Sequence, residues 1–513
     1  MRTFYVLNMA LHTSRGSSQH CAFYFTLLCF CLEDHSVDDD NSSIRSSSPV
    51  MDRNPSPPPD REGDQGGEEV DAIGETVYSK HWLFSTFTRL IQIVSEQNMG
   101  DSDAQMQLPE EDEDELCKIW DMAMDKDVAG FLQEFKAADI LLGVITKSRC
   151  PRLTEICVGI LGNIACFPDT CLTLSQNNDL GVVLLLLLGD TDPPTLLETS
   201  RLLLTCVSQS DVSSLWLERV RQQTSVCSSL CFIMCSSTNM DLLVKVGELV
   251  DKLFDLDEEL MKSWVTAGSQ PSDEDEEEEE EGERRLDVAS SLLEAAKQLR
   301  SESPEGLEVY LHALQLLTTI HHGIQTLAVA GGTGQALWTF LCEVVCEDLC
   351  QPDDPPFVLQ EQKGLLVHAL AVLSVLYACQ DQEAEHSEAD TLLPLVGSML
   401  RVLQYHREVS SGHGQKEKKD GQEEEEKVDE QLQALIQTTV EFLSDVITDL
   451  TKDAVSELVT RGYLTEKTCL SAVGSMLPQF SPAVQHLVFM LSEADPQLAD
   501  TVRKEFPVSL GPS

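Results

Sequence analysis

Basic residues are scarce in this sequence. Its 513 residues include 35 lysines and arginines against 87 aspartates and glutamates, so the formal net charge is −52 at pH 7. A surface this negative repels phosphate backbones and anionic lipid headgroups. We therefore expect neither direct nucleic-acid binding nor membrane binding, and proteins with basic segments are the expected partners. Solubility alone would also account for the charge.

Aromatic residues are few as well, at 6% of the chain, and no stretch shows sustained alternation of apolar and polar residues. Such alternation, with a period of two, is the pattern of half-buried β-strands. Its absence argues against a β-sandwich or barrel. Hydrophobic residues nevertheless reach 42%, which is close to ordinary globular usage, and leucine and valine dominate them. This composition predicts an all-α protein built of stacked helices.

Motifs of known chemistry are missing too. The sequence contains no Gly-x-x-x-x-Gly-Lys-Ser/Thr phosphate loop, no Gly-x-Ser-x-Gly elbow and no His-Glu-x-x-His zinc motif. The glycine-rich stretch 331–334 lacks the lysine of a phosphate loop and follows no predicted strand. The only adjacent histidines, His321 and His322, lie at a predicted helix end. We therefore expect no enzyme activity and no cofactor.

The 17 cysteines form no Cys-x-x-Cys pair and no set at zinc spacing. Most lie in apolar helical patterns, where a free cysteine behaves as a small buried hydrophobe. Core packing is therefore preferred over metal binding, and the usage indicates a reducing compartment, the nucleus or the cytosol. This interpretation includes two rows that each share one helix face: Cys227, Cys231 and Cys235, and Cys342, Cys346 and Cys350.

An internal repeat lies between residues 138 and 209. Pro151 matches Pro194 and Leu161 matches Leu204, without gaps and 43 residues apart (194 − 151). A period in the low forties with two or three helices per unit is typical of armadillo and HEAT arrays, in which neighbouring units stack to cover their apolar faces. The apolar run 182–188 could also be a buried strand. Its match to residues 139–145 of the same repeat favours a helix.

Composition divides the chain into six segments. Residues 1–75 are expected to be disordered, and 1–50 to be an upstream extension, because Met51 opens a second natural start. Two charged runs, 269–285 and 408–430, cannot pack and are expected to be linkers. The other three segments are predicted N-terminal armadillo-like repeats (76–268), middle helical repeats (286–407) and a C-terminal helical unit (431–507). Predicted helix starts are Ser303-Pro304, Ser481-Pro482 and Asp495-Pro496.

Long strings of this sequence, from about residue 51 to the end, resemble one family. They are residues 51–58, 77–84, 155–163, 192–201, 244–248 and 251–255. The chain is similar in these strings to the serum amyloid A-like protein 1 family, the synoviocyte proliferation-associated family. The resemblance implies an armadillo-like fold, no enzymatic activity and a nuclear protein, with the cytoplasm as a second compartment. It also implies a role in promoting the proliferation of synovial fibroblasts under inflammatory stimuli. Residues 416–419, with three lysines, resemble a weak nuclear-import signal.

Residues 155–165 resemble the third helix of an armadillo repeat. In armadillo proteins this helix lines the concave groove, where an asparagine hydrogen-bonds the backbone of an extended peptide. Asn163 occupies that position, and the position of the groove tryptophan is Gly159. In the next repeat these positions are Cys206 and Leu202, so the ladder of groove asparagines is broken. Alternatively, Asn163 satisfies backbone groups between repeats. The candidate protein-binding residues are Asn163, Gly159, Cys206 and Arg201.

Two functions from different classes follow. The first is a non-enzymatic interaction scaffold of armadillo type, whose acidic loops steer basic partners toward it. The second is an acidic chaperone or carrier of basic proteins, in which the tract 273–283 itself is the binding element. Deleting that tract should slow binding in the first case and abolish it in the second. A regulatory subunit of an enzyme complex is a third alternative.

Overall fold

The computed structural model describes residues 71–97, 107–269, 287–328, 332–351, 359–379, 389–412, 429–477 and 479–507. The described residues form helices and their connections, with one isolated β-bridge between Ala72 and Ser79 and no named strand. The all-α class predicted from the sequence is therefore confirmed. The predicted extension 1–50 and the lysine-containing stretch 416–419 lie outside the described residues.

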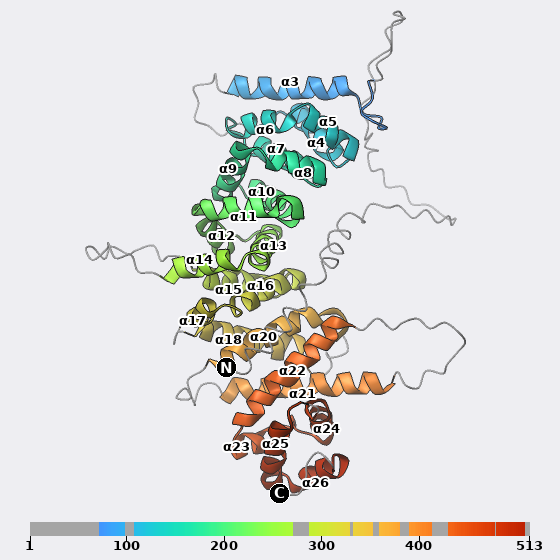
Figure 1. Ribbon diagram of the computed structural model, residues 1–513, viewed down its shortest axis with the longest axis vertical. Helices are drawn as coiled ribbons and strands as arrows, with labels where there is room; N and C mark the ends of the chain where they lie inside the picture. The colour runs from blue at the N-terminus through green and yellow to red at the C-terminus, as the bar shows by residue number, and fades with distance from the viewer. Residues whose placement is uncertain are drawn as a thin grey trace, which may run out of the picture. The chain divides into compact units, whose positions relative to one another are not determined.

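Most helices stack in two long rows, in which each helix packs on the next one (Figure 1). The first row, here called the α7 row, consists of α4 (Glu110–Met122), α7 (Pro151–Ile164), α10 (Pro193–Ser208), α13 (Met240–Leu256), α16 (Pro304–Leu317), α20 (Lys363–Ala378), α22 (Glu430–Asp449) and α25 (Ser481–Ala494). The second, here called the α9 row, consists of α3 (Lys80–Gln97), α6 (Ala137–Ile145), α9 (Asn178–Leu186), α12 (Ser225–Ser236), α15 (Val288–Leu299), α18 (Thr333–Glu343), α21 (Ala389–Gly412) and α24 (Glu466–Met476).

Shorter helices complete the repeats. They are α5 (Lys126–Glu134), α8 (Pro168–Ser175), α11 (Ser210–Gln222), α14 (Glu258–Ser269), α17 (His321–Leu327) and α23 (Lys452–Thr460), with α26 (Pro496–Glu505) as the last described helix. A 3₁₀ turn, η2 (Leu187–Gly189), follows α9, and a π-helix, η3 (Val344–Leu349), follows α18. In the predicted repeat, residues 138–209, helices α6 and α7 of the first half correspond to α9 and α10 of the second. The run 182–188 lies in α9 and η2, so the helical alternative is confirmed.

Helix boundaries follow capping chemistry. Ser303 accepts a hydrogen bond from the Gly306 N–H at the start of α16, and the Asp495 side chain accepts bonds from the first turn of α26. Such caps satisfy backbone donors that have no partner within the helix. Both predicted starts are confirmed. The third is wrong by one residue, because α25 begins at Ser481 itself and Phe480 occupies the capping position.

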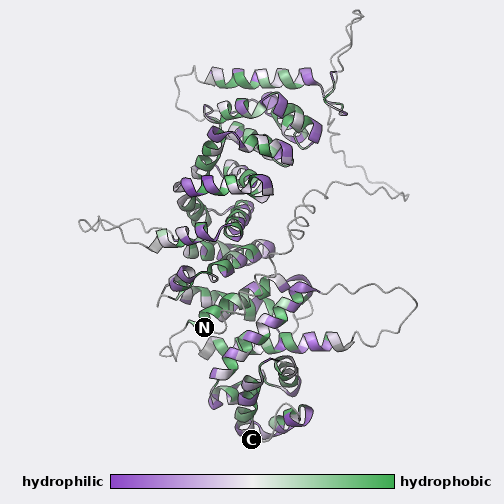
Figure 2. Cartoon of the chain, in the orientation of Figure 1, coloured by the Kyte–Doolittle hydropathy of each residue, from purple (hydrophilic) through white to green (hydrophobic). Residues whose placement is uncertain are grey.

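Apolar residues at helical spacing form a core that runs through both rows. On α13, for example, Leu242, Val246, Leu249 and Leu253 are all buried. Figure 2 shows apolar and polar residues alternating along most of the helices. Because each helix buries one face against its neighbours, every unit depends on the next for its core.

Packing continues across both charged segments that composition predicts as linkers. Helix α12 packs on α15, α13 on α16, and α20 on α22, and residues 67–513 form one compact unit. The three predicted helical segments are thus parts of one array. Two boundaries also differ from those drawn from composition. Ile73 is buried within the expected disordered segment 1–75, and α21 continues to Gly412, inside the expected linker 408–430.

Among the described residues, no single helix combines the length and apolar composition needed to cross a membrane. One pair, Pro168–Ser175 with Asn178–Gly189, meets these criteria only when its two helices are taken together, and it is bent by 88°.

Candidate protein-binding surface

Asn163 joins three successive helices of the α7 row. It is only 5% exposed. Its Nδ2 donates to the Trp120 carbonyl on α4 at 2.7 Å, and its Oδ1 accepts from Arg201 Nη1 on α10 at 3.1 Å. Both ends of the amide are therefore occupied within the chain. The structure places Asn163 in the second of the two roles considered, between repeats, and not as an amide presented to a peptide.

Gly159 makes room for the tryptophan of the preceding repeat. A Cβ atom at Gly159 would lie 2.1 Å from Cε2 of Trp120, far inside van der Waals contact. The Gly159 carbonyl accepts from Arg201 Nη2 at 3.2 Å. Asn163, Gly159 and Arg201 are thus brought together. Their contacts serve packing between α4, α7 and α10.

Cys206 lies apart from this group. It is fully buried, and its Sγ is 3.9 Å from the Sγ of Cys171 on α8. The hydrogen bond with Cys171, together with burial, raises the pKa of Cys206. Cys206 is therefore a core residue, and it is not available to a ligand at the surface.

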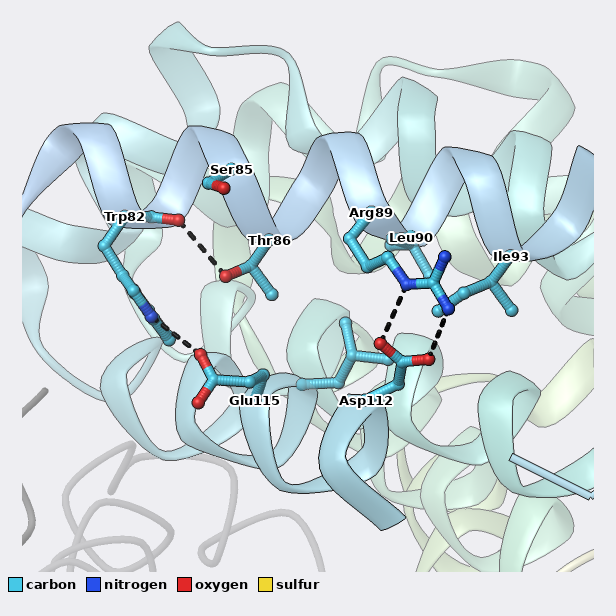
Figure 3. A pocket seen from close by; sticks show the side chains of 9 residues that line it. Trp82, Ser85, Thr86, Arg89, Leu90, Ile93, Asp112 and Glu115 are labelled. Atoms are coloured by element: carbon cyan, nitrogen blue, oxygen red, sulfur yellow. Dashed lines mark hydrogen bonds and ion pairs between the residues drawn. The ribbon is translucent and has the colours of Figure 1, made fainter. Parts of the chain in front are cut away.

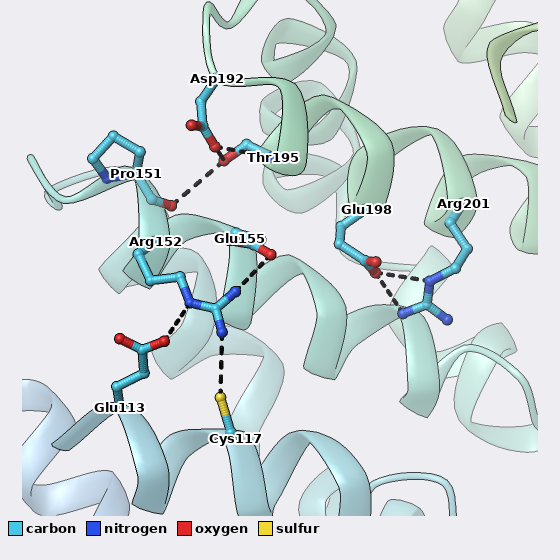
Figure 4. A network of polar contacts seen from close by, with 9 residues as sticks. All are labelled: Glu113, Cys117, Pro151, Arg152, Glu155, Asp192, Thr195, Glu198 and Arg201. Atoms are coloured by element: carbon cyan, nitrogen blue, oxygen red, sulfur yellow. Dashed lines mark hydrogen bonds and ion pairs between the residues drawn. The ribbon is translucent and has the colours of Figure 1, made fainter. Parts of the chain in front are cut away.

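Charged side chains on α4, α7 and α10 are paired with one another (Figure 4). Arg152 donates to Glu113 at 2.7 Å, bonds Glu155 at 2.6 Å and lies 3.6 Å from Cys117 Sγ. On α10, Arg201 pairs with Glu198 at 2.7 Å. We call this group the paired face; it comprises Glu113, Arg152, Glu155, Glu198 and Arg201. Its cations satisfy carboxylates of the same or the preceding helix.

A pair of histidines follows farther along the row, on α16 and α20. His312 Nδ1 lies 2.6 Å from Asp251 Oδ1, and the rings of His312 and His368 are 4.9 Å apart at their centroids. Burial opposes protonation of His312, but the bond with Asp251 raises its pKa overall. Burial and the neighbouring His312 lower the pKa of His368 to about 3. No motif in the sequence indicated this pair.

Four acidic side chains on α16 and α22 form no ion pair with a lysine or arginine of the described residues, although Glu441 accepts a hydrogen bond from Gln437 and Asp449 accepts one from Tyr377. We call them the open face: Glu308, Glu441, Asp445 and Asp449. Glu308 lies over Gly364, where a Cβ atom would be 2.2 Å from its Oε1.

Three residues of the open face follow each other at i, i+4 and i+8 on α22, a spacing at which like charges repel. Burial raises the pKa of Glu308 overall, although the neighbouring His312 acts to lower it. Burial, together with the neighbouring Glu441 and Asp449, raises the pKa of Asp445. Within the described ranges, neither Glu308 nor Asp445 has a hydrogen bond or ion pair. The sequence signal that could have found the open face is this spacing on α22.

A small cavity of about 190 Å³ lies between α3 and α4 (Figure 3). Its polar lining is already paired: Trp82 Nε1 donates to Glu115 at 2.7 Å, and Arg89 makes two bonds to Asp112 at 2.9 and 2.8 Å. No nucleophile with an adjacent base lines it. The described residues also contain no group of three or more histidines, cysteines or carboxylates placed to hold a metal.

The two rows of stacked helices, with Asn163 bonded to both neighbouring repeats, define an all-α helical-repeat protein of armadillo type. The chain belongs to the SAAL1 family. A family model described as the SAAL1 C-terminal domain matches residues 226–484. Protein saal1 of Danio rerio is 60% identical, with coverage of 90% of this chain and 95% of that protein. Protein SAAL1 of Homo sapiens is 50% identical, with coverage of 89% and 99%.

The chain is similar to a designed armadillo repeat protein, YIII(Dq)4CqI, at 16% identity and a TM-score of 0.38, over 56% of this chain and 99% of that one. It is also similar to an engineered protein, target OR497 of the Northeast Structural Genomics Consortium, at 15% identity and a TM-score of 0.39, over 82% and 87%.

Proposed function

We propose that this protein is a non-enzymatic scaffold that binds basic segments of other proteins on the open face of the α7 row. The supporting observation is the pair of half-buried carboxylates, Glu308 and Asp445, that make no hydrogen bond or ion pair among the described residues. Partial burial without a partner disfavours the charged form of a carboxylate. A lysine or arginine from another protein would relieve this cost through charge-assisted hydrogen bonds.

The paired face is the weaker candidate for the same role. Arg152 and Arg201 are already bound to carboxylates, and Asn163 is bound at both ends. A ligand there would have to replace an internal bond with an equivalent one, which yields little net affinity. A ligand that binds on the open face would instead replace only water at the carboxylates.

We also propose that the protein acts in the nucleus, with the cytoplasm as a second compartment, and promotes proliferation of synovial fibroblasts under inflammatory stimuli. The sequence strings shared with the family, such as residues 155–163 and 192–201, support this proposal. Binding rather than catalysis would carry the role, because the one cavity described above has its polar groups paired and holds no nucleophile with a base.

The test is a titration with a fluorescent peptide of alternating lysine and arginine, followed by anisotropy. The double variant Glu308→Gln/Asp445→Asn should bind on the order of tenfold more weakly, since each charge-assisted contact contributes roughly 1 kcal/mol. The matched control is Glu294→Gln/Glu466→Gln, which removes the same charge from α15 and α24 of the other row. The control should stay within about twofold of wild type. Equal loss in both variants would show that only net charge matters.

The alternative function, an acidic chaperone, is tested with the same peptide. Deleting residues 273–283 should slow association but leave most of the affinity if the open face binds, because distant charges act mainly by steering. Abolished binding after this deletion would favour the chaperone. In that case affinity should also collapse between about 50 and 300 mM salt, because an exposed acidic run is strongly screened.

A further inference from the structure

Two thiols from different helices meet in the repeat formed by α8, α9 and α10. Cys171 on α8 and Cys206 on α10 are both fully buried, and their Sγ atoms lie 3.9 Å apart. We call them the thiol pair. Cys227 and Cys231 are also bonded to each other, but they lie one turn apart on the same helix, α12. Cβ atoms four residues apart on a helix are about 5 to 6 Å from each other, whereas a disulfide needs roughly 3.5 to 4.5 Å. The thiol pair is held by two separate helices and does not have this restriction.

A chain of hydrogen bonds ends on the sulfur of Cys171. Trp216 Nε1 donates to Ser175 Oγ at 2.8 Å, and Ser175 Oγ lies 3.9 Å from Cys171 Sγ. Because an indole N–H only donates, the hydroxyl hydrogen of Ser175 remains available to Cys171. The bond from Cys206 lowers the pKa of Cys171, burial opposes this, and the bond from Ser175 lowers it further. The thiolate, which is the reactive form of cysteine, is therefore favoured at Cys171.

A buried cation lies beside the thiol pair. Arg219 on α11 is 8% exposed, and its Nη2 donates to the Ser175 carbonyl at 2.7 Å and to Asn178 Oδ1 at 2.9 Å. Both acceptors are neutral, and among the described residues no carboxylate pairs with Arg219. The bond with Cys171 and burial raise the pKa of Cys206, and the charge of Arg219 opposes that rise. A positive charge close to a thiol is typical of reactive cysteines and not of inert core cysteines.

Helix α8 provides a route for a small oxidant to Cys171. It has eight residues, and no side chain caps its start at Phe167. Leu172 and Thr173, which directly follow Cys171, are exposed, so α8 lies at the surface and its inner side covers the thiol pair. Local opening of a short surface element costs much less free energy than unfolding of the whole protein. A molecule as small as hydrogen peroxide reaches Cys171 when α8 opens.

We propose that Cys171 and Cys206 form a reversible disulfide when the chain meets hydrogen peroxide, with Cys171 as the attacking thiol. The Cys171 thiolate attacks one peroxide oxygen and breaks the O–O bond, which leaves a sulfenic acid on Cys171. The departing hydroxide takes up the proton that the Cys171 thiol had lost and becomes water. The sulfur of Cys206 then attacks the sulfur of Cys171 and displaces its hydroxyl group, which leaves with the Cys206 proton as a second water. Two thiols and one peroxide thus become one disulfide and two waters.

The disulfide joins the first and third helices of one repeat. It closes a loop of 35 residues (206 − 171), which restricts the unfolded chain and so stabilises the folded one. Helix α10 also carries Arg201, whose bonds to Asn163 and Gly159 join it to α7. Oxidation therefore fixes α8 to a helix that already holds the preceding repeat. Small thiols such as glutathione reverse the bond by exchange. This inference does not depend on the proposed function.

The test is peptide mapping of the full chain, without reduction, after treatment with hydrogen peroxide. The expected product is a linked pair of peptides carrying Cys171 and Cys206, which is two hydrogens lighter than its parts and which dithiothreitol separates. The matched control is Cys469→Ala on α24, which removes another fully buried cysteine and should leave the yield of this product unchanged. Absence of the product, or an equal yield of a link between Cys206 and Cys166, overturns the proposal.

A second measurement identifies the attacking thiol. In Cys206→Ala the sulfenic acid of Cys171 has no resolving partner, so dimedone should label Cys171 on the order of tenfold more than it labels Cys206 in Cys171→Ala. Alanine suits both positions because a buried free cysteine packs as a small hydrophobe. Equal labelling, or stronger labelling of Cys206, contradicts the assigned order. The mapping of the wild-type chain needs neither variant, so it decides whether the disulfide forms even if one of them fails to fold.

Discussion

The paired face and the open face belong to the same row of helices but treat charge differently. On α7 and α10, Arg152 and Arg201 are each bound to carboxylates within hydrogen-bond distance. On α16 and α22, Glu308 and Asp445 are half-buried and have no such partner among the described residues. The fold is the same in both places, so the fold alone does not assign a role. Charge that is satisfied internally supports stacking, and charge that is not satisfied is available to another molecule.

The largest effect is expected from Gly159→Ala on the paired face. The added Cβ would overlap the ring of Trp120, which is partly buried and packs against the core. Overpacking of this kind costs about 1 to 3 kcal/mol of folding free energy. Urea denaturation should show the loss. The control is Gly143→Ala on α6, where a Cβ meets open space, and which should gain roughly 0.5 to 1 kcal/mol because alanine favours the helix.

Asn163→Ala should come next. It removes the donor to the Trp120 carbonyl and the acceptor of Arg201 together, and it leaves both groups partly buried between repeats. Unsatisfied buried polar groups cost about 1 to 3 kcal/mol. We expect a loss of about 2 kcal/mol in the free energy of unfolding. An unchanged urea midpoint would show that Asn163 does not hold the repeats together.

Substitution of glutamate by glutamine should change the stability of the protein in opposite directions on the two faces. Glu198→Gln removes a charge that Arg201 needs and should destabilise the protein by about 1 kcal/mol. Glu308→Gln removes a half-buried charge whose burial outweighs its attraction to His312, and it should stabilise the protein slightly, by less than about 1 kcal/mol. Thermal unfolding of the two variants at neutral pH measures both. Changes of the same sign would abolish the distinction between the faces.

The smallest expected effect is the pH dependence of the stability gained by Glu308→Gln. Burial raises the pKa of Glu308 in the folded state, so folding favours its protonated form. Stability from this group is fully present below the unfolded pKa, near 4.3, and is lost as pH rises through the higher folded value. The advantage of Glu308→Gln should therefore be absent at about pH 4 and present at pH 7. Urea midpoints at the two pH values test this, and an advantage of equal size at both would contradict it.

Periodicity and the 43-residue repeat were enough to predict the helical array, because an apolar stripe shows which face of a helix must be covered. They could not show what satisfies the polar groups on that face. The contact between Gly159 and Trp120 depends on how two units are stacked. Asn163 was open to two roles, because spacing alone does not reveal where both ends of an amide point.

The histidine pair and the open face show a further reason why parts of the site could not be predicted from the sequence. His312 and His368 belong to units whose spacing differs from 43 residues, so no shared motif connects them. Glu308 is half-buried because Gly364 on α20 lets it lie against that helix. Such burial follows from packing between helices more than fifty residues apart in the chain. A count of acidic residues does not distinguish it from a solvated charge.

The double attachment of Asn163 also has a mechanical consequence. Its amide bonds α4 and α10 at once, so separating either helix from α7 disturbs the bond to the other. If the chain were stretched from its two ends, the repeats around α4, α7 and α10 would give way as one block. An optical-tweezers trace would then show a single long extension for this block in place of several short ones. In Asn163→Ala this single extension would divide into several shorter ones.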